Sequence, residues 1–306
     1  MSKCSFTPYN IPTNSKSDLT IKSLLKDDNT FSILGYPDDE GIFKNGGKIG
    51  AALGPDSIRT SLYKMTPLKN MEGLTLKDLG NLSFKDSSLE ARHSFASDKV
   101  KSELDSSKTC ITFGGGHDYG YVDGAAFLKN SNSSKPLIVN FDAHFDLRNL
   151  DKGISSGTPF FRLIEEFGES FELFEVGIQK QCNSANLFDF ASSKENIKTL
   201  HYDNLYPNHT FSMIHFEKEL PQADQKRDCY ISVDIDGFSS AFAPGCSQSW
   251  PTGFDMNSFF KMFDHLIKNF NVKILGIYEV SPPLDHTELT SRLAALITYR
   301  FLELKA

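Results

Sequence analysis

Short apolar runs, rich in β-branched and aromatic residues, recur along the chain at intervals of roughly 30 to 40 residues. They span residues 31–34, 74–79, 110–113, 137–141, 171–176, 199–202, 229–233 and 272–278. Runs of this length between polar segments are typical of buried strands. The pattern therefore predicts eight strands.

Segments with the apolar spacing of amphipathic helices separate most of these runs. Helices are expected near residues 56–63, 89–104, 118–128, 258–267 and 288–302. Because strands and helices alternate to the end of the chain, we expect helical crossovers that cover both faces of a sheet. The predicted fold is a three-layer α/β/α arrangement with a central, mostly parallel, eight-stranded sheet.

Nothing along the chain marks a boundary between domains. The polar loops at 131–135 and 207–210 are too short to be linkers. A length of 306 residues also admits two smaller domains, but we expect a single domain over residues 17–306. Residues 1–16 contain Pro, Asn and Ser without periodicity, and they are expected to form a poorly ordered N-terminal arm.

Composition narrows the class of partner. The net charge is −7 and the basic residues are scattered, so the chain lacks the electrostatic footprint of a nucleic-acid or anionic-membrane binder. A small-molecule substrate is expected, and a homo-oligomer remains open. There is no apolar run long enough to cross a bilayer, no secretory leader, and only five widely spaced cysteines. We therefore expect a cytoplasmic protein.

Candidate chemistry lies directly after four of the expected strands. Ligands of open parallel sheets bind beyond the carboxyl ends of the strands, so the residues at those ends are informative. Side chains two residues apart in an extended strand end point to the same side. The residues concerned are His117 after a glycine run, Asp142, His144 and Asp146 in one run, Asp234 and Asp236 in another, and Glu279.

Two imidazoles and four aspartates at one edge carry a formal charge of −4, which would repel itself unless cations lay among them. Oxygen-rich ligation without thiolate favours Mn²⁺ over a cysteine-bound zinc, with Co²⁺, Fe²⁺ and Ni²⁺ left open. Two such ions would lower the pKa of a shared water. Hydrolysis is therefore the expected reaction class.

Each of these residues also has an ordinary structural interpretation. A histidine after glycines is commonly a turn residue, and an aspartate at a strand end is commonly a helix N-cap. The glycine run 114–116 resembles a phosphate-binding loop, but its spacing differs and no Lys-Ser/Thr pair follows. Three strand ends with alternating ligand types together favour the metal site.

The motifs resemble those of the arginase and agmatinase superfamily, the ureohydrolases. They stand here as Gly115-Gly116-His117, Asp142-Ala143-His144-Phe145-Asp146, Ser232-Val233-Asp234-Ile235-Asp236 and Ala243-Pro244-Gly245. The resemblance runs from about Gly35 to the C-terminal helix. It implies an arginase-like fold and two Mn²⁺ sites, one of His117, Asp142, Asp146 and Asp234 and the other of His144, Asp142, Asp234 and Asp236.

The resemblance also implies roles in catalysis. Glu279 would bind the cationic amidine or guanidine through paired hydrogen bonds. Asp146 would lie near the nitrogen that leaves. Arginases have His where this chain has Ser156, so the proton donor to that nitrogen is Asp146, a water or another group.

Within the superfamily the chain most resembles the formimidoylglutamases, in residues 38–55, 155–160 and at Arg148, where arginases have Asn. This resemblance implies hydrolysis of N-formimidoyl-L-glutamate to L-glutamate and formamide in histidine degradation. The substrate carboxylates would be bound by Arg148, whose guanidinium pairs with carboxylates in a fork, with Ser155, Ser156 and Thr158 as further candidates.

Other functions stay open. A guanidino-acid hydrolase of the same fold would release urea, and a regulatory protein would bind metal without turnover. Deacetylase-type zinc amidohydrolases lack the paired ligands that His117 and Asp236 supply here. Arg148 could instead form an ion pair with Asp151. Arginases also carry an Asp near Ser239-Ser240, so the loop on the substrate side is expected to differ.

Overall fold

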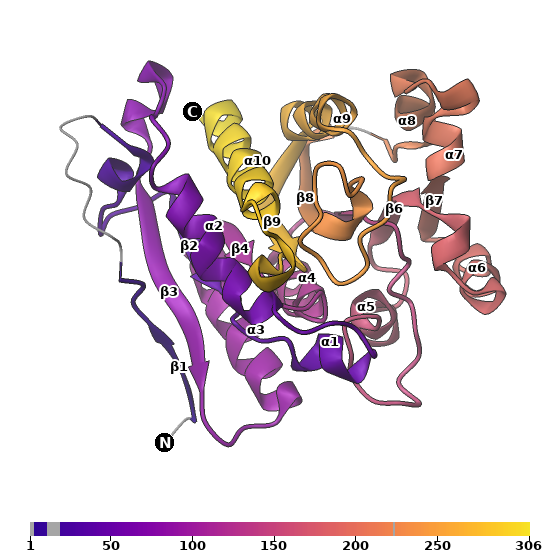
Figure 1. Ribbon diagram of the computed structural model, residues 1–306, viewed down its shortest axis with the longest axis horizontal. Coiled ribbons are helices and arrows are strands. Elements are labelled where there is room, and N and C mark those ends of the chain that lie inside the picture. Colours follow the sequence, from indigo (N-terminus) through magenta and orange to yellow (C-terminus); the bar gives the residue numbers. More distant parts are fainter. Residues whose placement is uncertain (1–2, 11–18, 223) are drawn as a thin grey trace.

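A single sheet organises the protein, whose computed structural model describes residues 3–10, 19–222 and 224–306. Within these residues nine strands lie in the order β1-β3-β2-β4-β9-β8-β5-β6-β7 (Figure 1). All neighbours are parallel except β1 and β3. The strands are β1 Cys4–Thr7, β2 Phe31–Gly35, β3 Leu76–Phe84, β4 Thr109–Phe113, β5 Leu137–Phe141, β6 Glu172–Ile178, β7 Ile197–His201, β8 Asp224–Asp234 and β9 Phe270–Tyr278.

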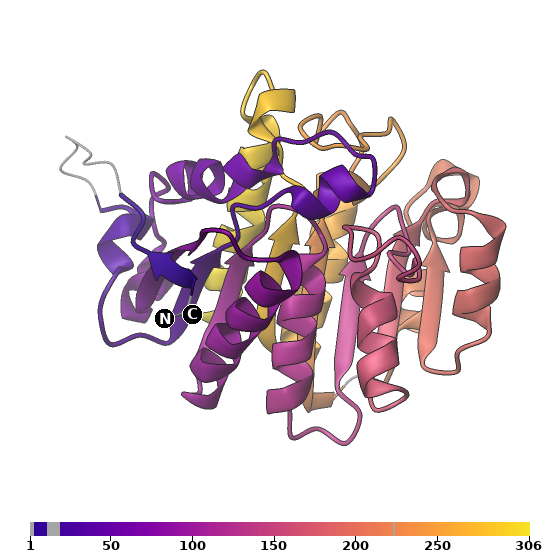
Figure 2. The same cartoon turned by 90° about the horizontal axis from the view of Figure 1, so that it is seen from below.

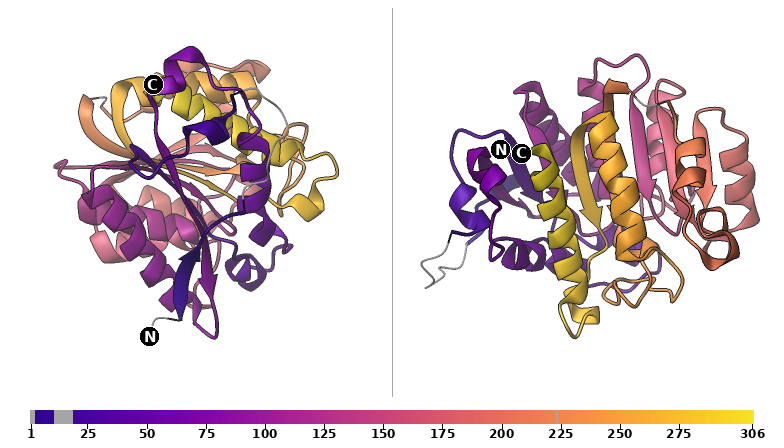
Figure 3. Two further views of the ribbon diagram at one scale, coloured as in Figure 1. Left: turned by 90° about the vertical axis from the view of Figure 1, so that its left-hand side faces the viewer. Right: turned by 90° about the horizontal axis from the view of Figure 1, so that it is seen from above.

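Helices cover both faces of this sheet. One layer contains α3, α4 and α5, and the other contains α2, α9 and α10 (Figures 2 and 3). Three more helices, α6, α7 and α8, pack around the edge of the sheet that β7 forms (Figure 1). The bounds are α1 Glu40–Lys44, α2 Gly54–Leu62, α3 Leu89–Asp105, α4 Tyr119–Asn130, α5 Pro159–Phe167, α6 Ala185–Ser192, α7 Tyr202–Leu205, α8 Met213–Glu219, α9 Met256–Asn269 and α10 Leu289–Lys305. The three-layer prediction is confirmed.

Each face of the sheet has its own apolar core. In β5, Leu137, Val139 and Phe141 contribute to the core that also contains residues of α2, α9 and α10. The intervening Ile138 contributes to the core beneath α3, α4 and α5. A strand buried on both faces needs apolar residues at every position, which explains why the sequence shows continuous runs instead of alternation.

The prediction of eight strands is wrong by one, because the sheet has nine. The additional strand is β1, which pairs antiparallel with the edge strand β3 from Cys4↔Phe84 to Thr7↔Asn81. It lies inside the segment that we expected to be a poorly ordered arm. Its stability comes from main-chain pairing with a distant strand, and four residues are too few to show periodicity. Residues 1–2 and 11–16 of the expected arm lie outside the described residues.

Strand order decides where the chemistry gathers. Strands β4, β9, β8 and β5 are consecutive in the sheet, so their carboxyl ends lie side by side. These are the four strands that the candidate ligands and Glu279 follow. In the described part of the chain, no helix combines the length and apolar character needed to cross a membrane.

Candidate metal centre

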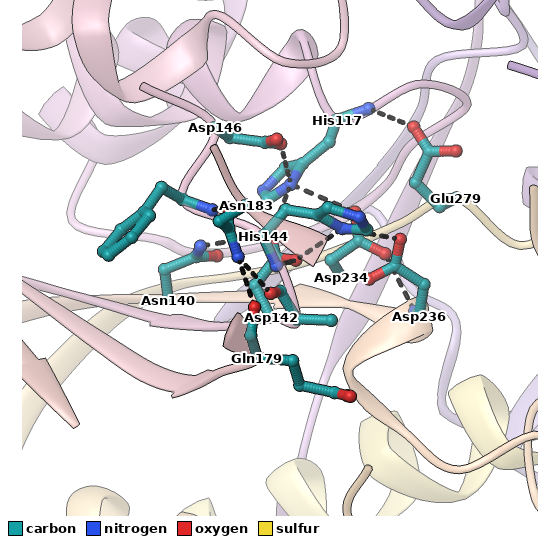
Figure 4. A network of polar contacts seen from close by, with 12 residues as sticks. His117, Asn140, Asp142, His144, Asp146, Gln179, Asn183, Asp234, Asp236 and Glu279 are labelled. Atoms are coloured by element: carbon teal, nitrogen blue, oxygen red, sulfur yellow. Dashed lines mark hydrogen bonds and ion pairs between the residues drawn. The ribbon is translucent and has the colours of Figure 1, made fainter. Parts of the chain in front are cut away.

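The six candidate ligands form two overlapping groups at this edge of the sheet. Within each group, one ligand atom from every residue lies within 4.8 Å of the others. Figure 4 shows their side chains converging from the ends of separate strands. The first group is His117, Asp142, Asp146 and Asp234, and the second is Asp142, His144 and Asp236.

The first group is built around one nitrogen of a buried histidine. His117 Nδ1 lies 3.2 Å from Asp142 Oδ2, 2.9 Å from Asp146 Oδ2 and 3.2 Å from Asp234 Oδ2. The nitrogen makes no hydrogen bond within the described residues. Buried polar atoms normally have a partner, so three acidic oxygens around an unpartnered nitrogen fit a bound cation.

The second group is more open to the cavity. His144 Nδ1 lies 3.5 Å from Asp142 Oδ1 and 3.2 Å from Asp236 Oδ2. The other oxygen of Asp236 is buried without a hydrogen bond from any described residue. Asp142 belongs to both groups, as the resemblance implies for a bridging ligand. Asp234, the other implied bridge, is brought only into the first group.

The site is electrostatically strained as a set of side chains alone. Burial, and then the charges of Asp236 and Asp142, raise the pKa of Asp234 well above its usual range. Burial likewise raises the pKa of Asp236 to about 6, although His144 opposes the shift. For His117, burial favours the neutral form, but its three aspartate contacts prevail and raise the pKa. Two divalent cations would compensate this negative charge.

Backbone geometry aims the ligands. Asp142 Oδ1 accepts a hydrogen bond from the His144 main-chain N at 2.7 Å, and Asp234 Oδ1 accepts one from the Asp236 N at 2.9 Å. Asp234 therefore caps the turn Ile235–Gly237 with one oxygen while its other oxygen faces His117. Asp234 can therefore cap this turn and serve as a metal ligand at the same time.

Two site residues have a left-handed backbone conformation, which non-glycine residues rarely adopt. They are Asp146 with φ 49° and Glu279 with φ 66°. Such conformations cost free energy and cluster at functional sites. At Glu279 the surroundings hold the carboxylate in place, because Oε1 accepts a hydrogen bond from the His117 main-chain N at 3.0 Å (Figure 4).

A cavity of about 240 Å³ opens beside the ligands. Its wall combines ligand carboxylates with Glu279, Arg148 and Ser156. Arg148 is exposed to the cavity and forms no ion pair with any described residue. The alternative partner Asp151 accepts a hydrogen bond from Asn149 instead. Arg148 is therefore available to an anionic ligand.

Of the three serine and threonine candidates for substrate binding, only Ser156 lines the cavity. Its Oγ accepts a hydrogen bond from Asn45 Nδ2 at 3.2 Å. Thr158 Oγ1 donates to the Ser155 carbonyl at 2.8 Å and accepts from the Ser155 N. Those two residues are absent from the cavity wall and shape the turn before α5.

Sequence reasoning missed several residues of the wall, among them Asn45, Gln181, Asn183 and Trp250. Asn183 Nδ2 donates to the Ala143 and Gln179 carbonyls, and its Oδ1 accepts from the Phe145 N. It therefore clamps the loop that carries His144. Asn183 follows β6, so the rule of inspecting every strand end could have found it, although its residue type gives no sign of chemistry.

Comparisons with known proteins identify the family of this chain. Residues 29–303 match the model of the arginase family. The formimidoylglutamase of Streptococcus pyogenes serotype M3 is 30% identical over 94% of this chain and 89% of its own length. A Trypanosoma cruzi formiminoglutamase with Mn²⁺ is 25% identical, with a TM-score of 0.80 over 94% of this chain and 98% of that chain.

The fold extends to a Bacillus subtilis formimidoylglutamase, with a TM-score of 0.83 at 23% identity, over 98% of this chain and 95% of that chain. Because residues 29–303 of its 306 residues match the family model, the chain belongs to the arginase family.

Proposed function

We propose that this protein hydrolyses N-formimidoyl-L-glutamate to L-glutamate and formamide. One observation carries the proposal: a single cavity joins the aspartate-rich centre and Glu279 to Arg148, whose guanidinium forms no ion pair with the described residues. The substrate has the matching charges, with a cationic amidine at one end and two carboxylates at the other. The 30% identity to a formimidoylglutamase supports the same activity.

The proposed cofactor is a pair of Mn²⁺ ions. The two groups described above would hold them, with Asp142 common to both. The family resemblance implies Asp234 as a second shared ligand. When bound, such ions lower the pKa of a water between them and supply hydroxide at neutral pH. The donor set fits, since it contains carboxylates and imidazoles and no thiolate.

Glu279 would orient the amidine. Its carboxylate is buried, and one oxygen is already held by the His117 main-chain N, so the side chain is fixed before substrate binds. Burial and the neighbouring Asp234 raise its pKa, and an amidinium opposite it would favour the charged form. Paired hydrogen bonds to a planar cation then place the amidine carbon over the metal centre.

Arg148 and Asp146 would act at the other side of the reacting bond. Arg148 would bind a glutamate carboxylate as a fork, with Ser156 and Asn45 beside it. The bond between the amidine carbon and the glutamate nitrogen breaks, and that nitrogen must gain a proton. Asp146 lines the same cavity, so we assign it that proton transfer.

A product assay tests the proposal. Purified protein loaded with Mn²⁺ is incubated separately with N-formimidoyl-L-glutamate, arginine, agmatine and 4-guanidinobutyrate, while formamide, glutamate and urea are measured. We expect glutamate and formamide in equal amounts from the first substrate only. Urea from arginine or guanidinobutyrate would instead support the guanidino-acid hydrolase, and no product from any substrate would support a metal-binding regulatory protein.

We also propose a cytoplasmic location. Cys110, Cys182, Cys229 and Cys246 form no disulfide with any described residue. Reduced cysteines are typical of proteins in a reducing compartment. The proposed partner is the small-molecule substrate alone, with neither nucleic acid nor membrane as a partner.

A further inference from the structure

Three polar side chains form a row through the buried sheet, just before the metal ligands. Asn140 in β5 is paired in register with Ser232 in β8 on one side and with Glu175 in β6 on the other. Residues paired in this way point to the same face of a parallel sheet. All three are fully buried. Apolar residues would be the ordinary occupants of such positions.

Two members of the row contact metal ligands, each by a different route, and Glu175 contacts Asn140. Asn140 Nδ2 donates to Asp142 Oδ2 at 3.2 Å and to Glu175 Oε2 at 2.9 Å. Ser232 Oγ lies 2.8 Å from His117 Nε2. Asp142 is shared by both groups of ligands, whereas His117 belongs to the first group alone. The two branches of the row therefore reach different parts of the site.

The Glu175 carboxylate makes one hydrogen bond to the described residues, with the Asn140 amide. Among the described residues it forms no ion pair, and its Oε1 is buried without a hydrogen bond. Its one strong contact fixes the orientation of the Asn140 amide. An acceptor at Glu175 requires the NH₂ group on that side, and the second N–H of the same group then points to Asp142. A rotated amide would direct its own oxygen at the aspartate and repel it.

We propose that Glu175 is a positioning residue for the metal centre. Through Asn140 it holds Asp142, the carboxylate common to both sites, and so sets the affinity for both ions. The inference rests on the ligand set of the proposed function but not on its substrate.

Titration of the metal-free protein with Mn²⁺, followed by the electron paramagnetic resonance signal of free Mn²⁺, tests this proposal. Glu175→Leu is expected to raise the dissociation constants of both ions by about 10- to 100-fold, because the Asn140 amide is no longer held toward Asp142 and the loss of a hydrogen bond to a metal ligand usually has this effect. Ser232→Ala, the matched control, should weaken only one ion, since the metal ligand that Ser232 contacts is His117, which belongs to the first group alone.

Glu175→Gln separates positioning from packing. Glutamine has nearly the shape of glutamate and keeps an oxygen that can take the place of Oε2. The amide oxygen still accepts from Asn140, and both dissociation constants should stay within about threefold of the wild-type values. An equal loss in the Gln and Leu variants would overturn the proposal.

A double variant supplies a test that does not depend on one substitution. If Glu175 acts through Asn140, then Asn140→Leu combined with Glu175→Leu should bind Mn²⁺ no more weakly than Asn140→Leu alone. Additive losses would contradict the proposal. Thermal melts in metal-free buffer report whether each variant is folded. A protein that binds two Mn²⁺ yet releases no formamide would disprove the proposed substrate while leaving this test intact.

Discussion

Arg148 and Glu279 place a basic and an acidic group on the wall of one cavity. The presence of both groups limits the substrates that the site can bind. An amidine or guanidine needs the carboxylate, and only a substrate that also carries an acid group needs the arginine. Agmatine lacks such a group. Substrate selection within the family is therefore expected to depend on residues beside the ligands, whereas the ligands decide the reaction class.

Replacing Arg148 tests that division. Arg148→Met is expected to lower kcat/KM for N-formimidoyl-L-glutamate by about 10- to 100-fold, mainly through KM, because charge-assisted hydrogen bonds to a carboxylate are lost. Arg148→Lys keeps the charge without the fork, so its steady-state parameters should lie in between. An unchanged KM in the Met variant would exclude Arg148 from substrate binding.

Replacing a ligand should remove metal and activity together. Asp234→Asn takes away one of the three carboxylates around His117 Nδ1. We expect kcat to fall by more than about 100-fold, beyond the loss typical of residues that merely support ligands. Metal content and formamide release measure the two effects. Asp105→Asn, on the exposed surface of α3, is the control. Full activity with two bound ions in the Asp234 variant would disprove the ligand assignment.

Among the elements, β1 stands apart, because it lies at the edge of the sheet and far in strand order from the site. Its attachment to β3 requires a glycine. Gly80 has φ +82°, and a side chain there would come within 1.8 Å of the Thr7 carbonyl oxygen. Conformation and close approach both exclude a Cβ at this position.

Gly80→Ala is therefore expected to detach β1. The free energy of unfolding should fall by more than about 1 kcal/mol, since alanine is strained at positive φ. Metal content and kcat should be unchanged because β4, β9, β8 and β5 are not involved. Gly73→Ala, with open space and no positive φ, should leave the melting temperature nearly unaltered. Equal melting temperatures for the two variants would show that β1 contributes little to stability.

At the scale of the whole molecule, the acidic centre is expected to make the stability of the fold depend on metal binding. The fold brings four aspartates close together beside the cavity. Cations that bind only the folded state stabilise that state by mass action. Bound metal ions would then offset the unfavourable free energy of bringing these negative charges together.

Removing the metal should consequently lower thermal stability. Mn²⁺ at 100 times its dissociation constant is expected to add about 2.7 kcal/mol per site, and a chelator should reverse the gain. Calorimetry with increasing Mn²⁺ measures the effect. Asp234→Asn should show a smaller dependence on Mn²⁺. A wild-type melting temperature that is insensitive to Mn²⁺ would argue against a metal site in the folded protein.

The sequence by itself determined the local features. Continuous apolar runs marked eight strands because burial on both faces requires apolar side chains at every position. His117, Asp142 and Asp234 were identifiable because the carboxyl ends of parallel strands are where ligands bind, and because their spacing has a period of two.

Tertiary structure decided the rest. Residues 117, 142, 234 and 279 come together only because β4, β9, β8 and β5 are adjacent, an order set by pairing between distant segments and not by local pattern. The same holds for β1, whose four residues are ordered only by β3. Glu175 appears in the sequence as one of two glutamates within the run 171–176. Its place beside Asn140 depends on strand register, which no local preference encodes.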